Sequence, residues 1–435
     1  MYRKALIDLH QWKQSTSRKP LIIQGARQVG KTWLMQEFGR LEFQHTAYIN
    51  FEQNEQAHLL FEPDLNPIRI TQALSAVAGH PITPDTLLIF DEIQTCPKAL
   101  TSLKYFCEQM PQQPILAAGS LLGVSLHKGT SFPVGKVEFL PLYPLTFLEF
   151  LQAIGEEGLY KFLLKKDFTS MPAFKQKYED LLKQYYYVGG MPEVVAEFSR
   201  TKDYQKVRQI QLMLLNDYEQ DFSKYTTNTT AVRLREVWHS IPAQLAKENK
   251  KFIYGVIREG ARAKEYELAI EWLQDCGLIY KLHRIGKPAM PLSMYKDLNA
   301  FKLFMVDVGL LGALSNLDAQ ALIDGNRMFT EFKGALTEQY VLQQLKSMPN
   351  MPIYYWTSKA LAEVDFVIQH NNHIIPIEAK ATTNLRAKSL KTYCTNYQPT
   401  YALRFSMADY KQTGNLYDIP LYMVECLKDI VKTSI

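Results

Sequence analysis

The stretch GARQVGKT, residues 25–32, decides the fold of the first part of the chain. It matches the pattern G-x-x-x-x-G-K-[ST], in which a glycine-rich loop surrounds phosphate groups with backbone N–H donors. The apolar run LII at 21–23 predicts a strand before it, and WLM at 33–35 with Phe38 has the spacing of a helix after it. Because a helix N-terminus favours anions, the stretch predicts a nucleotide-binding fold.

Each residue type in this loop has a predicted task, with ATP as the ligand and GTP as the alternative nucleotide. Lys31 is expected to reach the β and γ phosphate oxygens, and the Thr32 hydroxyl to complete a Mg2+ site. The predicted nucleotide-binding residues are Gly25, Ala26, Arg27, Gln28, Val29, Gly30, Lys31, Thr32 and Trp33. The simpler alternative is a glycine turn between a strand and a helix.

Two further apolar runs end in polar residues that suit hydrolysis of a triphosphate. LLIF at 87–90 leads into Asp91, which we expect to hold Mg2+, and Glu92, which we expect to polarise the attacking water. ILAA at 115–118 leads to Ser120, which is predicted to sense the γ-phosphate or the catalytic water. Without the phosphate-loop pattern, Asp91 and Glu92 would be interpreted as two solvated acids at the end of a buried strand. Catalytic roles therefore fall to Lys31, Glu92 and Ser120.

The composition is that of a globular protein with several domains. Its 435 residues are 47% apolar, and 49 Lys and Arg stand against 44 Asp and Glu, so nucleic-acid contact is permitted without being demanded. The five cysteines lack C-x-x-C spacing, which argues against a zinc ribbon or a disulfide framework. With no apolar run of roughly 18 residues and no signal-peptide core, we predict a cytoplasmic protein that does not contact a membrane.

Changes in hydrophobic period predict four domains. Residues 1–145 alternate apolar runs with helical patterns and form a P-loop ATPase core with a parallel sheet. Residues 146–226 read as amphipathic helices that form a lid, broken at VGGMP, 188–192. Residues 227–325 read as three helices and two strands, which predicts a winged-helix domain. Residues 326–435 read as a compact α/β domain, so the predicted fold class of the whole chain is α/β.

The predicted winged-helix domain has an unusual third helix. Its sequence, KEYELAIEWLQDC at 264–276, carries four acidic residues against Lys264. A winged helix can place a helix in the major groove of DNA or contact a protein partner. Because an acidic helix repels phosphate groups, the sequence favours a structural or partner-binding role here.

Four polar residues near the C-terminus form a candidate second site. Asp365 lies in the predicted strand VDFVI, and Glu378 and Lys380 share one face of the next strand, IIPIEAK. Glu338 lies in the apolar stripe of the preceding helix, where a carboxylate needs a cation or strong hydrogen bonds. The pattern favours a nuclease-type site in which the carboxylates bind Mg2+ or Mn2+ and Lys380 positions the attacking water. A solvated hairpin with incidental charges is the alternative.

Several segments together resemble a known family. The core resembles the prokaryotic AAA-type ATPases of the AAA_14 class through GARQVGKT, YINFE, DEIQTCP with LKYF, AAGSLLG, VEFLPLYPLTFLEF and YYYVGGMPEVV. The tail resembles the DUF4143 region that usually follows, through FKLFMVDVGLL, GALTEQYVLQQL, YYW, EVDFVI and IEAK. The resemblance implies an ATPase core, a winged-helix middle and a C-terminal restriction-endonuclease-like fold of the PD-(D/E)xK type.

The resemblance also implies roles for individual residues. It assigns nucleotide binding to Gly25, Gly30, Lys31 and Thr32, magnesium to Asp91, water activation to Glu92 and sensing to Ser120. It assigns a nuclease-like site to Glu338, Asp365, Glu378 and Lys380. Such proteins commonly carry arginine before the VEF strand, whereas this chain has Lys136, which cannot make a planar bidentate phosphate contact. No arginine finger is therefore assigned, and Arg233 and Arg235 are candidate second sensors.

Two hypotheses about function follow. In the first, ATP binding and slow hydrolysis reposition the winged-helix and C-terminal domains, which act on double-stranded DNA and, in one variant, cleave it with a second Mg2+ or Mn2+. In the second, the C-terminal domain is a binding module, and the chain is an ATP-controlled switch or scaffold that assembles with a protein partner or with further copies of itself. Both hypotheses make the chain an ATPase.

Overall fold

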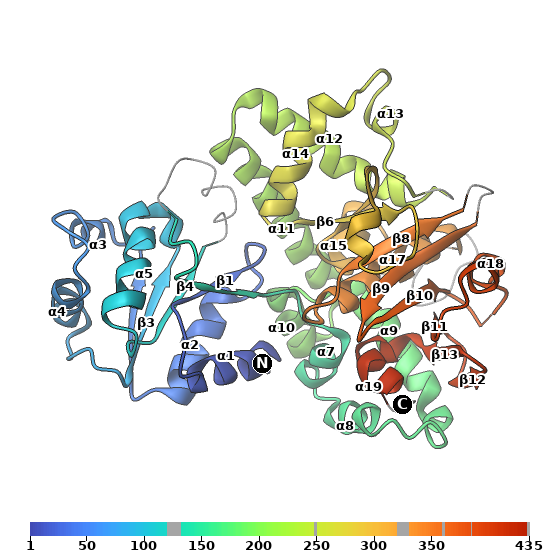
Figure 1. The fold of residues 1–435 in the computed structure, drawn as a ribbon, viewed down its shortest axis with the longest axis horizontal. Helices are drawn as coiled ribbons and strands as arrows, with labels where there is room; N and C mark the ends of the chain where they lie inside the picture. The colour runs from blue at the N-terminus through green and yellow to red at the C-terminus, as the bar shows by residue number, and fades with distance from the viewer. Residues whose placement is uncertain (120–131, 248–249, 320–329, 359–361, 384, 433–435) are drawn as a thin grey trace. The chain divides into compact units, whose positions relative to one another are not determined.

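The structure is a computed structural model that describes residues 1–119, 132–247, 250–319, 330–358, 362–383 and 385–432 (Figure 1). The chain forms two compact units. The first unit comprises residues 2–143 together with 272–278, and the second comprises residues 144–271 and 279–435, with residue 1.

The first unit is built on a five-stranded parallel sheet with the order β2-β3-β4-β1-β5. Its strands are β1 Leu21–Gln24, β2 His45–Asn50, β3 Thr86–Asp91, β4 Ile115–Ala118 and β5 Glu138–Pro141. These are the five apolar runs of the sequence, and the parallel sheet is confirmed. Since the carboxyl ends of parallel strands meet at one edge, the residues after β1 and β3 lie on the same side of the sheet.

Helices cover this sheet and bury its apolar faces (Figure 1). They are α1 Ala5–Gln14, α2 Lys31–Glu42, α3 Glu55–Leu59, α4 Pro67–Ala78 and α5 Pro97–Gln109, with a short 3-10 turn η1 at Ile93–Thr95. Leu88 and Phe90 of β3 are fully buried and pack in one cluster with Ile22 of β1 and Phe106 of α5. Strands covered on both faces need continuous apolar runs, which explains why LLIF lacks polar alternation.

The second unit begins with helices. They are α7 Phe147–Ala153, α8 Glu157–Lys165, α9 Lys175–Val188, α10 Pro192–Thr201, α11 Tyr204–Tyr225, α12 Asn228–Leu245, α13 Tyr254–Ile257 and α14 Ala263–Asp275, the last of which runs into the first unit. A capping box of Thr146 and Glu149 starts α7, because each side chain accepts a hydrogen bond from the other residue's backbone N–H. The helical character predicted for 146–226 agrees with these elements.

An eight-stranded mixed sheet follows, with the order β12-β13-β11-β10-β9-β8-β6-β7. Its strands are β6 Ile279–Ile285, β7 Lys296–Met305, β8 Ile353–Thr357, β9 Glu363–His370, β10 His373–Ala379, β11 Ala402–Ser406, β12 Lys411–Thr413 and β13 Leu416–Pro420. The hairpin of β6 and β7, predicted as part of a separate winged-helix domain, joins this sheet because β6 pairs in parallel with β8. The segments 227–325 and 326–435 therefore share one sheet.

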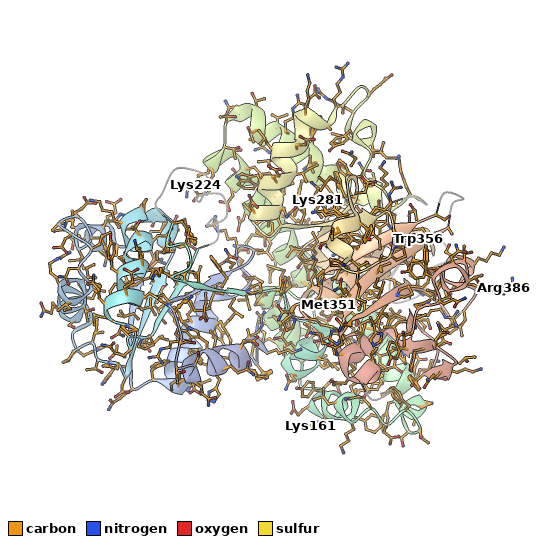
Figure 2. All side chains as sticks on the ribbon, viewed as in Figure 1. Lys161, Lys224, Lys281, Met351, Trp356 and Arg386 are labelled. Atoms are coloured by element: carbon orange, nitrogen blue, oxygen red, sulfur yellow. The ribbon has the colours of Figure 1, made fainter. Side chains whose placement is uncertain are left out.

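Helices and 3-10 turns complete the second unit. They are η3 Met171–Phe174, η4 Leu292–Tyr295, α15 Val308–Leu314, α17 Thr330–Lys346, α18 Lys388–Tyr397, η6 Leu421–Cys426 and α19 Leu427–Lys432. Trp356 of β8, labelled in Figure 2, lies edge-on to Tyr393 of α18 with ring centroids 5.1 Å apart. Within the described residues, none of the helices combines the length and the apolar character that crossing a membrane requires.

The buried carboxylate of Asp307 links three parts of the second unit. It accepts hydrogen bonds from the N–H of Gly190 after α9 (2.7 Å), from the Gln343 amide of α17 (2.9 Å) and from the first N–H groups of α15. A side chain at Gly189, where φ is +74°, would put Cβ 2.1 Å from an Asp307 oxygen. The helix break predicted at 188–192 is thus also where the Asp307 carboxylate packs against the backbone of two glycines.

Candidate functional site

The phosphate-loop pattern forms a tight turn between β1 and α2. Gly25 has φ +156°, and a Cβ there would lie 2.3 Å from the carbonyl oxygen of Leu142. Gly30, with φ +95°, occupies the position before the first residue of α2. Only glycine adopts these conformations without strain and without a clash. The local backbone structure therefore explains why both positions of the pattern are glycine.

Lys31, the first residue of α2, turns its ammonium group back into this loop. Its Nζ donates 2.8 Å hydrogen bonds to the carbonyl oxygens of Gly25 and Ala26, and the side chain is only 6% exposed. Burial lowers the pKa of Lys31 to about 8, although the carboxylates of Glu92 and Asp91 oppose the change. A charged group held by neutral carbonyl oxygens can exchange them for phosphate oxygens, which bind a cation more strongly.

Thr32 and Asp91, the two predicted Mg2+ ligands of this site, meet at the end of β3. The Thr32 hydroxyl donates a 2.7 Å hydrogen bond to Oδ2 of Asp91, and the Tyr48 hydroxyl of β2 donates a 2.9 Å hydrogen bond to the same oxygen. Asp91 is 2% exposed, and burial is the main reason that the pKa of Tyr48 rises to about 12. Hydroxyl and carboxylate oxygens are the ligands that Mg2+ prefers, so the pair suits that ion.

Glu92 has an unusual backbone conformation. Its φ of +49° and ψ of +42° are left-handed, which costs a non-glycine residue about 1 kcal/mol. Its carboxylate accepts a 2.6 Å hydrogen bond from the Gln94 amide, and its N–H donates to Asp91 at 3.1 Å. This left-handed turn directly follows Asp91, and strain of this kind is concentrated at functional sites.

The other predicted residues of this site have varied positions. Ala26 and Val29 are buried in the loop, whereas Trp33 is 40% exposed on the first turn of α2. Ser120, the predicted sensor, lies outside the described residues. Lys136 forms an ion pair with Glu108 at 2.9 Å. The candidate second sensors have partners within the second unit, with Arg233 bonded to Tyr266 and Glu236 and Arg235 bonded to Ser223.

Sequence reasoning assigned no role to two residues that support this site. One is Tyr48, which contacts Asp91 from the neighbouring strand. The other is Arg3, which is 4% exposed and donates hydrogen bonds to the carbonyls of Val29 (3.0 Å) and Tyr143 (2.5 Å). Strand pairing could have indicated Tyr48, since Asn50 lies opposite Asp91 and Tyr48 is two residues before it on the same face. No local pattern marks Arg3.

The candidate second site is also brought together by the fold. Lys380 Nζ lies 2.5 Å from Glu378 Oε1, and Asp365 Oδ2 accepts a 2.8 Å hydrogen bond from the N–H of Ala379 on the neighbouring strand β10. Glu338 of α17 is 8% exposed, so its predicted place on a buried face is confirmed. A carboxylate there was expected to need a cation or strong hydrogen bonds, and the ammonium groups of Lys250 and Lys302 lie beside it.

Two lysines from outside the predicted site enter the carboxylate cluster. Lys302 of β7 is fully buried, pairs with Glu363, and lies 4.0 Å from Glu338 Oε2. Lys250, which precedes α13, forms a short ion pair with Glu338 Oε1. A lysine inside the apolar run FKLFM was the available signal, since a strand buried along that run must give its ammonium a partner.

The ionisable groups of this cluster change one another's pKa values. Burial raises the pKa of Asp365 well above its usual value, and the nearby Glu338 and Glu378 raise it further. Burial opposes the charge of Glu338, but Lys250 and Lys302 hold its pKa below the usual value. Burial likewise opposes the charge of Lys302, yet Glu363 and Glu338 raise its pKa. The cluster therefore favours charged Glu338 and Lys302, whereas its surroundings disfavour the charged form of Asp365.

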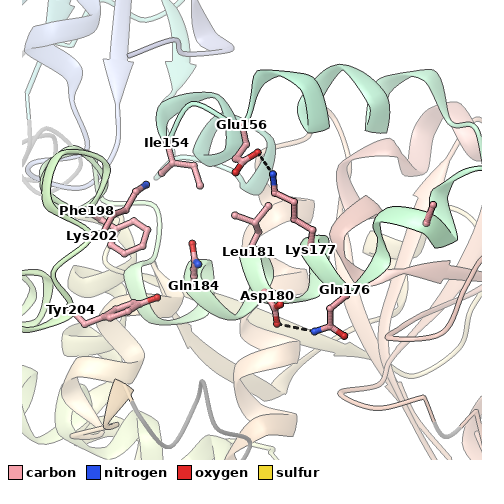
Figure 3. A pocket seen from close by; sticks show the side chains of 11 residues that line it. Ile154, Glu156, Gln176, Lys177, Asp180, Leu181, Gln184, Phe198, Lys202 and Tyr204 are labelled. Atoms are coloured by element: carbon pink, nitrogen blue, oxygen red, sulfur yellow. Dashed lines mark hydrogen bonds and ion pairs between the residues drawn. The ribbon is translucent and has the colours of Figure 1, made fainter.

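Metal-binding groups of side chains and cavities are two further features that could mark a functional site. Among the described residues, no three His, Cys, Asp or Glu side chains are grouped so that they could hold a metal ion. A cavity of about 660 Å³ lies among the helices of the second unit, where Lys177 pairs with Glu156 and Gln176 with Asp180 (Figure 3). None of the residues predicted for either site lines this cavity.

Three family models match separate parts of the chain. Residues 17–151 match the AAA domain AAA_14, residues 333–424 match the domain of unknown function DUF4143, and residues 179–321 match the domain of unknown function DUF8612. The chain therefore carries an AAA-type P-loop ATPase domain and a DUF4143 domain, as the resemblance of its motifs implied.

Comparison with whole proteins gives weaker similarity. No curated protein matches. Among solved structures, the chain is similar to a Walker-type ATPase of Pyrococcus abyssi at 15% identity and a TM-score of 0.45, covering 72% of this chain and 95% of that one. It is also similar to the Aeropyrum pernix ORC1 protein in complex with DNA at 15% identity and a TM-score of 0.27, covering 73% and 93% of the two chains.

Proposed function

Because residues 17–151 form an AAA domain, we propose that this chain binds ATP with Mg2+ at the carboxyl edge of its parallel sheet and hydrolyses it there. The observation that carries the proposal is the meeting of Thr32 with Asp91 at 2.7 Å beside the loop that holds the Lys31 ammonium. Two separate parts of the chain thereby supply the groups that a nucleotide site needs: the start of α2 gives the cation and the hydroxyl, and the end of β3 gives the carboxylate.

Each side chain has a defined task in this proposal. Lys31 would leave the carbonyls of Gly25 and Ala26 and bind the β and γ phosphate oxygens. Thr32 and Asp91 would hold Mg2+, which supplies positive charge to the phosphates as negative charge develops. Glu92 would accept a hydrogen bond from the attacking water and orient it toward the γ-phosphorus. The left-handed backbone of Glu92 supports this role, because strained backbone is concentrated at functional sites.

For the second unit, the switch or scaffold hypothesis is the one we favour over a nuclease. The specific observation is that lysines already pair with two of the three carboxylates of the candidate nuclease site, Glu338 and Glu378. One pair of experiments on the full chain, with and without ATP, tests whether it binds double-stranded DNA and whether it assembles with further copies of itself. Light scattering that reports ATP-dependent assembly, together with calorimetry that detects no DNA binding, supports the switch; DNA binding without assembly contradicts it.

Nucleotide binding is tested with Lys31→Ala. Without the ammonium the phosphate oxygens lose their charged donor, so affinity for MgATP should fall by about 100-fold or more, equivalent to about 3 kcal/mol. Isothermal titration calorimetry measures this directly. Lys136→Ala is the matched control, because it removes an exposed lysine of the same unit that is paired with Glu108. Equal affinities of Lys31→Ala and the control would overturn the proposed site.

A further inference from the structure

The resemblance to PD-(D/E)xK nucleases implies a divalent cation held by Glu338, Asp365 and Glu378. Whether the residues fit such an ion is decided by what the carboxylates already contact. Glu338 Oε1 contacts Lys250, Glu378 Oε1 contacts Lys380, and Asp365 Oδ2 accepts the N–H of Ala379. The three carboxylates that would bind a divalent cation are therefore already bound to lysine side chains or to a backbone N–H of the chain itself.

The position of Lys302 is the decisive feature. It reaches the cluster from β7, which belongs to the segment predicted as the winged helix, and its ammonium is fully removed from solvent. It pairs with Glu363 at the start of β9 and lies 4.0 Å from Glu338 Oε2 on α17. One ammonium thus bridges carboxylates from two elements, as a metal ion would.

We propose that Lys302 takes the place of the divalent cation, so that the carboxylate cluster is an internally neutralised ion-pair core and not a metal site. The cluster then has a different purpose. It docks β7 and the loop at Lys250 onto α17, β9 and β10, and it joins the middle segment of the chain to the DUF4143 segment. This inference goes beyond the proposed ATPase function and does not depend on it.

The balance of charge supports the proposal that Lys302 stands where a divalent cation would bind. Four carboxylates, Glu338, Glu363, Asp365 and Glu378, face three ammonium groups, Lys250, Lys302 and Lys380. One protonated carboxyl group makes the set neutral. A divalent cation added beside Lys302 would leave a buried excess of positive charge, which a low-dielectric interior disfavours strongly.

Two carboxylate oxygens of the cluster could become metal ligands if Lys302 were removed. Glu338 Oε2 and Glu378 Oε2 are buried and accept no hydrogen bond in the described part of the chain. With Lys302 in place, the first of these oxygens is compensated only by charge, at 4.0 Å. If the lysine were replaced by an apolar side chain, both oxygens would be available in a cluster that had lost one positive charge. Removing Lys302 should therefore create a metal site.

The test measures Mn2+ binding to the full chain by electron paramagnetic resonance, without nucleotide. All variants carry Asp91→Asn, which removes the other candidate metal position. We expect Lys302→Met to bind Mn2+ at least about tenfold more tightly than the parent, and Glu338→Gln added to it to abolish that gain. Lys281→Met on β6 is the matched control, since Lys281 (Figure 2) lies on the same sheet over the Phe301 ring and should gain nothing.

Two results would overturn the inference. The first is a parent protein that binds one Mn2+ and loses it on Asp365→Asn, because the cluster would then be a metal site despite Lys302. The second is a folded Lys302→Met that binds Mn2+ no better than the parent. If Lys302→Met does not fold, Lys302→Gln, which removes the same charge but keeps a hydrogen-bond donor for Glu363, takes its place in a thermal unfolding assay. Mn2+ should raise the Tm of Lys302→Gln but not that of the parent, and equal responses would contradict the proposal.

Discussion

Two buried lysines of this chain, Lys31 and Lys302, differ in the groups that hold them. Lys31 is held by two neutral carbonyl oxygens, and its pKa falls to about 8 because burial outweighs the nearby acids. Lys302 is held by carboxylates, and its pKa rises because those charges outweigh burial. The comparison teaches that the partner of a buried charge decides its use: neutral partners leave it available to a ligand, whereas opposite charges keep it as part of the structure.

The largest expected contrast is in stability. Lys302→Met removes one partner of a buried ion-pair set and leaves uncompensated carboxylates, so it should lower the free energy of unfolding by about 3–5 kcal/mol. Lys31→Met removes a desolvated charge that has no bound counter-ion, so it should leave stability unchanged or slightly increased. Scanning calorimetry of the full chain compares the two. Equal losses would show that the two lysines are held alike.

A smaller contrast is expected between two carboxylates of the cluster. Glu338→Gln removes the negative charge that Lys250 and Lys302 share, which should cost about 1–3 kcal/mol. Asp365→Asn puts a neutral amide of the same shape where the surroundings raise the pKa of the carboxyl group and disfavour its charge, so stability should change by less than about 0.5 kcal/mol. Urea unfolding monitored by circular dichroism measures both. A greater loss in Asp365→Asn than in Glu338→Gln would mean that Asp365 carries the charge.

The smallest expected effect is on pH dependence. Phosphate groups favour charged Lys31, so its pKa of about 8 in the unliganded protein should rise on binding ATP, and binding should take up a proton above that pH. Affinity for ATP should therefore fall about tenfold between pH 7 and pH 9. Calorimetry at both values measures it. Lys302, with a raised pKa, should stay charged over this range, and an affinity for ATP independent of pH would contradict the account of Lys31.

Much of the first unit could be predicted from the sequence because its information is local. The glycines of the loop, the start of a helix at Lys31 and the acids after β3 all follow from neighbouring residues. Buried parallel strands also have continuous apolar runs, which are easily recognised. Glu338 was predictable by the same kind of reasoning, because a carboxylate in an apolar helical stripe needs a partner.

The identity of the partner could not be predicted in the same way. Lys250 precedes Glu338 by 88 residues, and Asp307 meets Gly190 across 117 residues, so neither pairing leaves a mark in the local sequence. The pairing of β6 with β8 is similarly distant, and it places strands from two predicted domains in one sheet. Local patterns indicated which charges would be buried, and only the tertiary fold supplied the groups that compensate them.

The central claim, that the edge of the parallel sheet is an ATPase site, is tested most directly by the turnover of Glu92→Gln. This change keeps the size and hydrogen-bonding ability of the side chain but removes the charge that orients water, so Mg2+-dependent release of phosphate should fall by about 100-fold or more. Calorimetry on the same sample should give an ATP affinity close to that of the unmodified chain. Hydrolysis that continues at the original rate in Glu92→Gln would contradict the account.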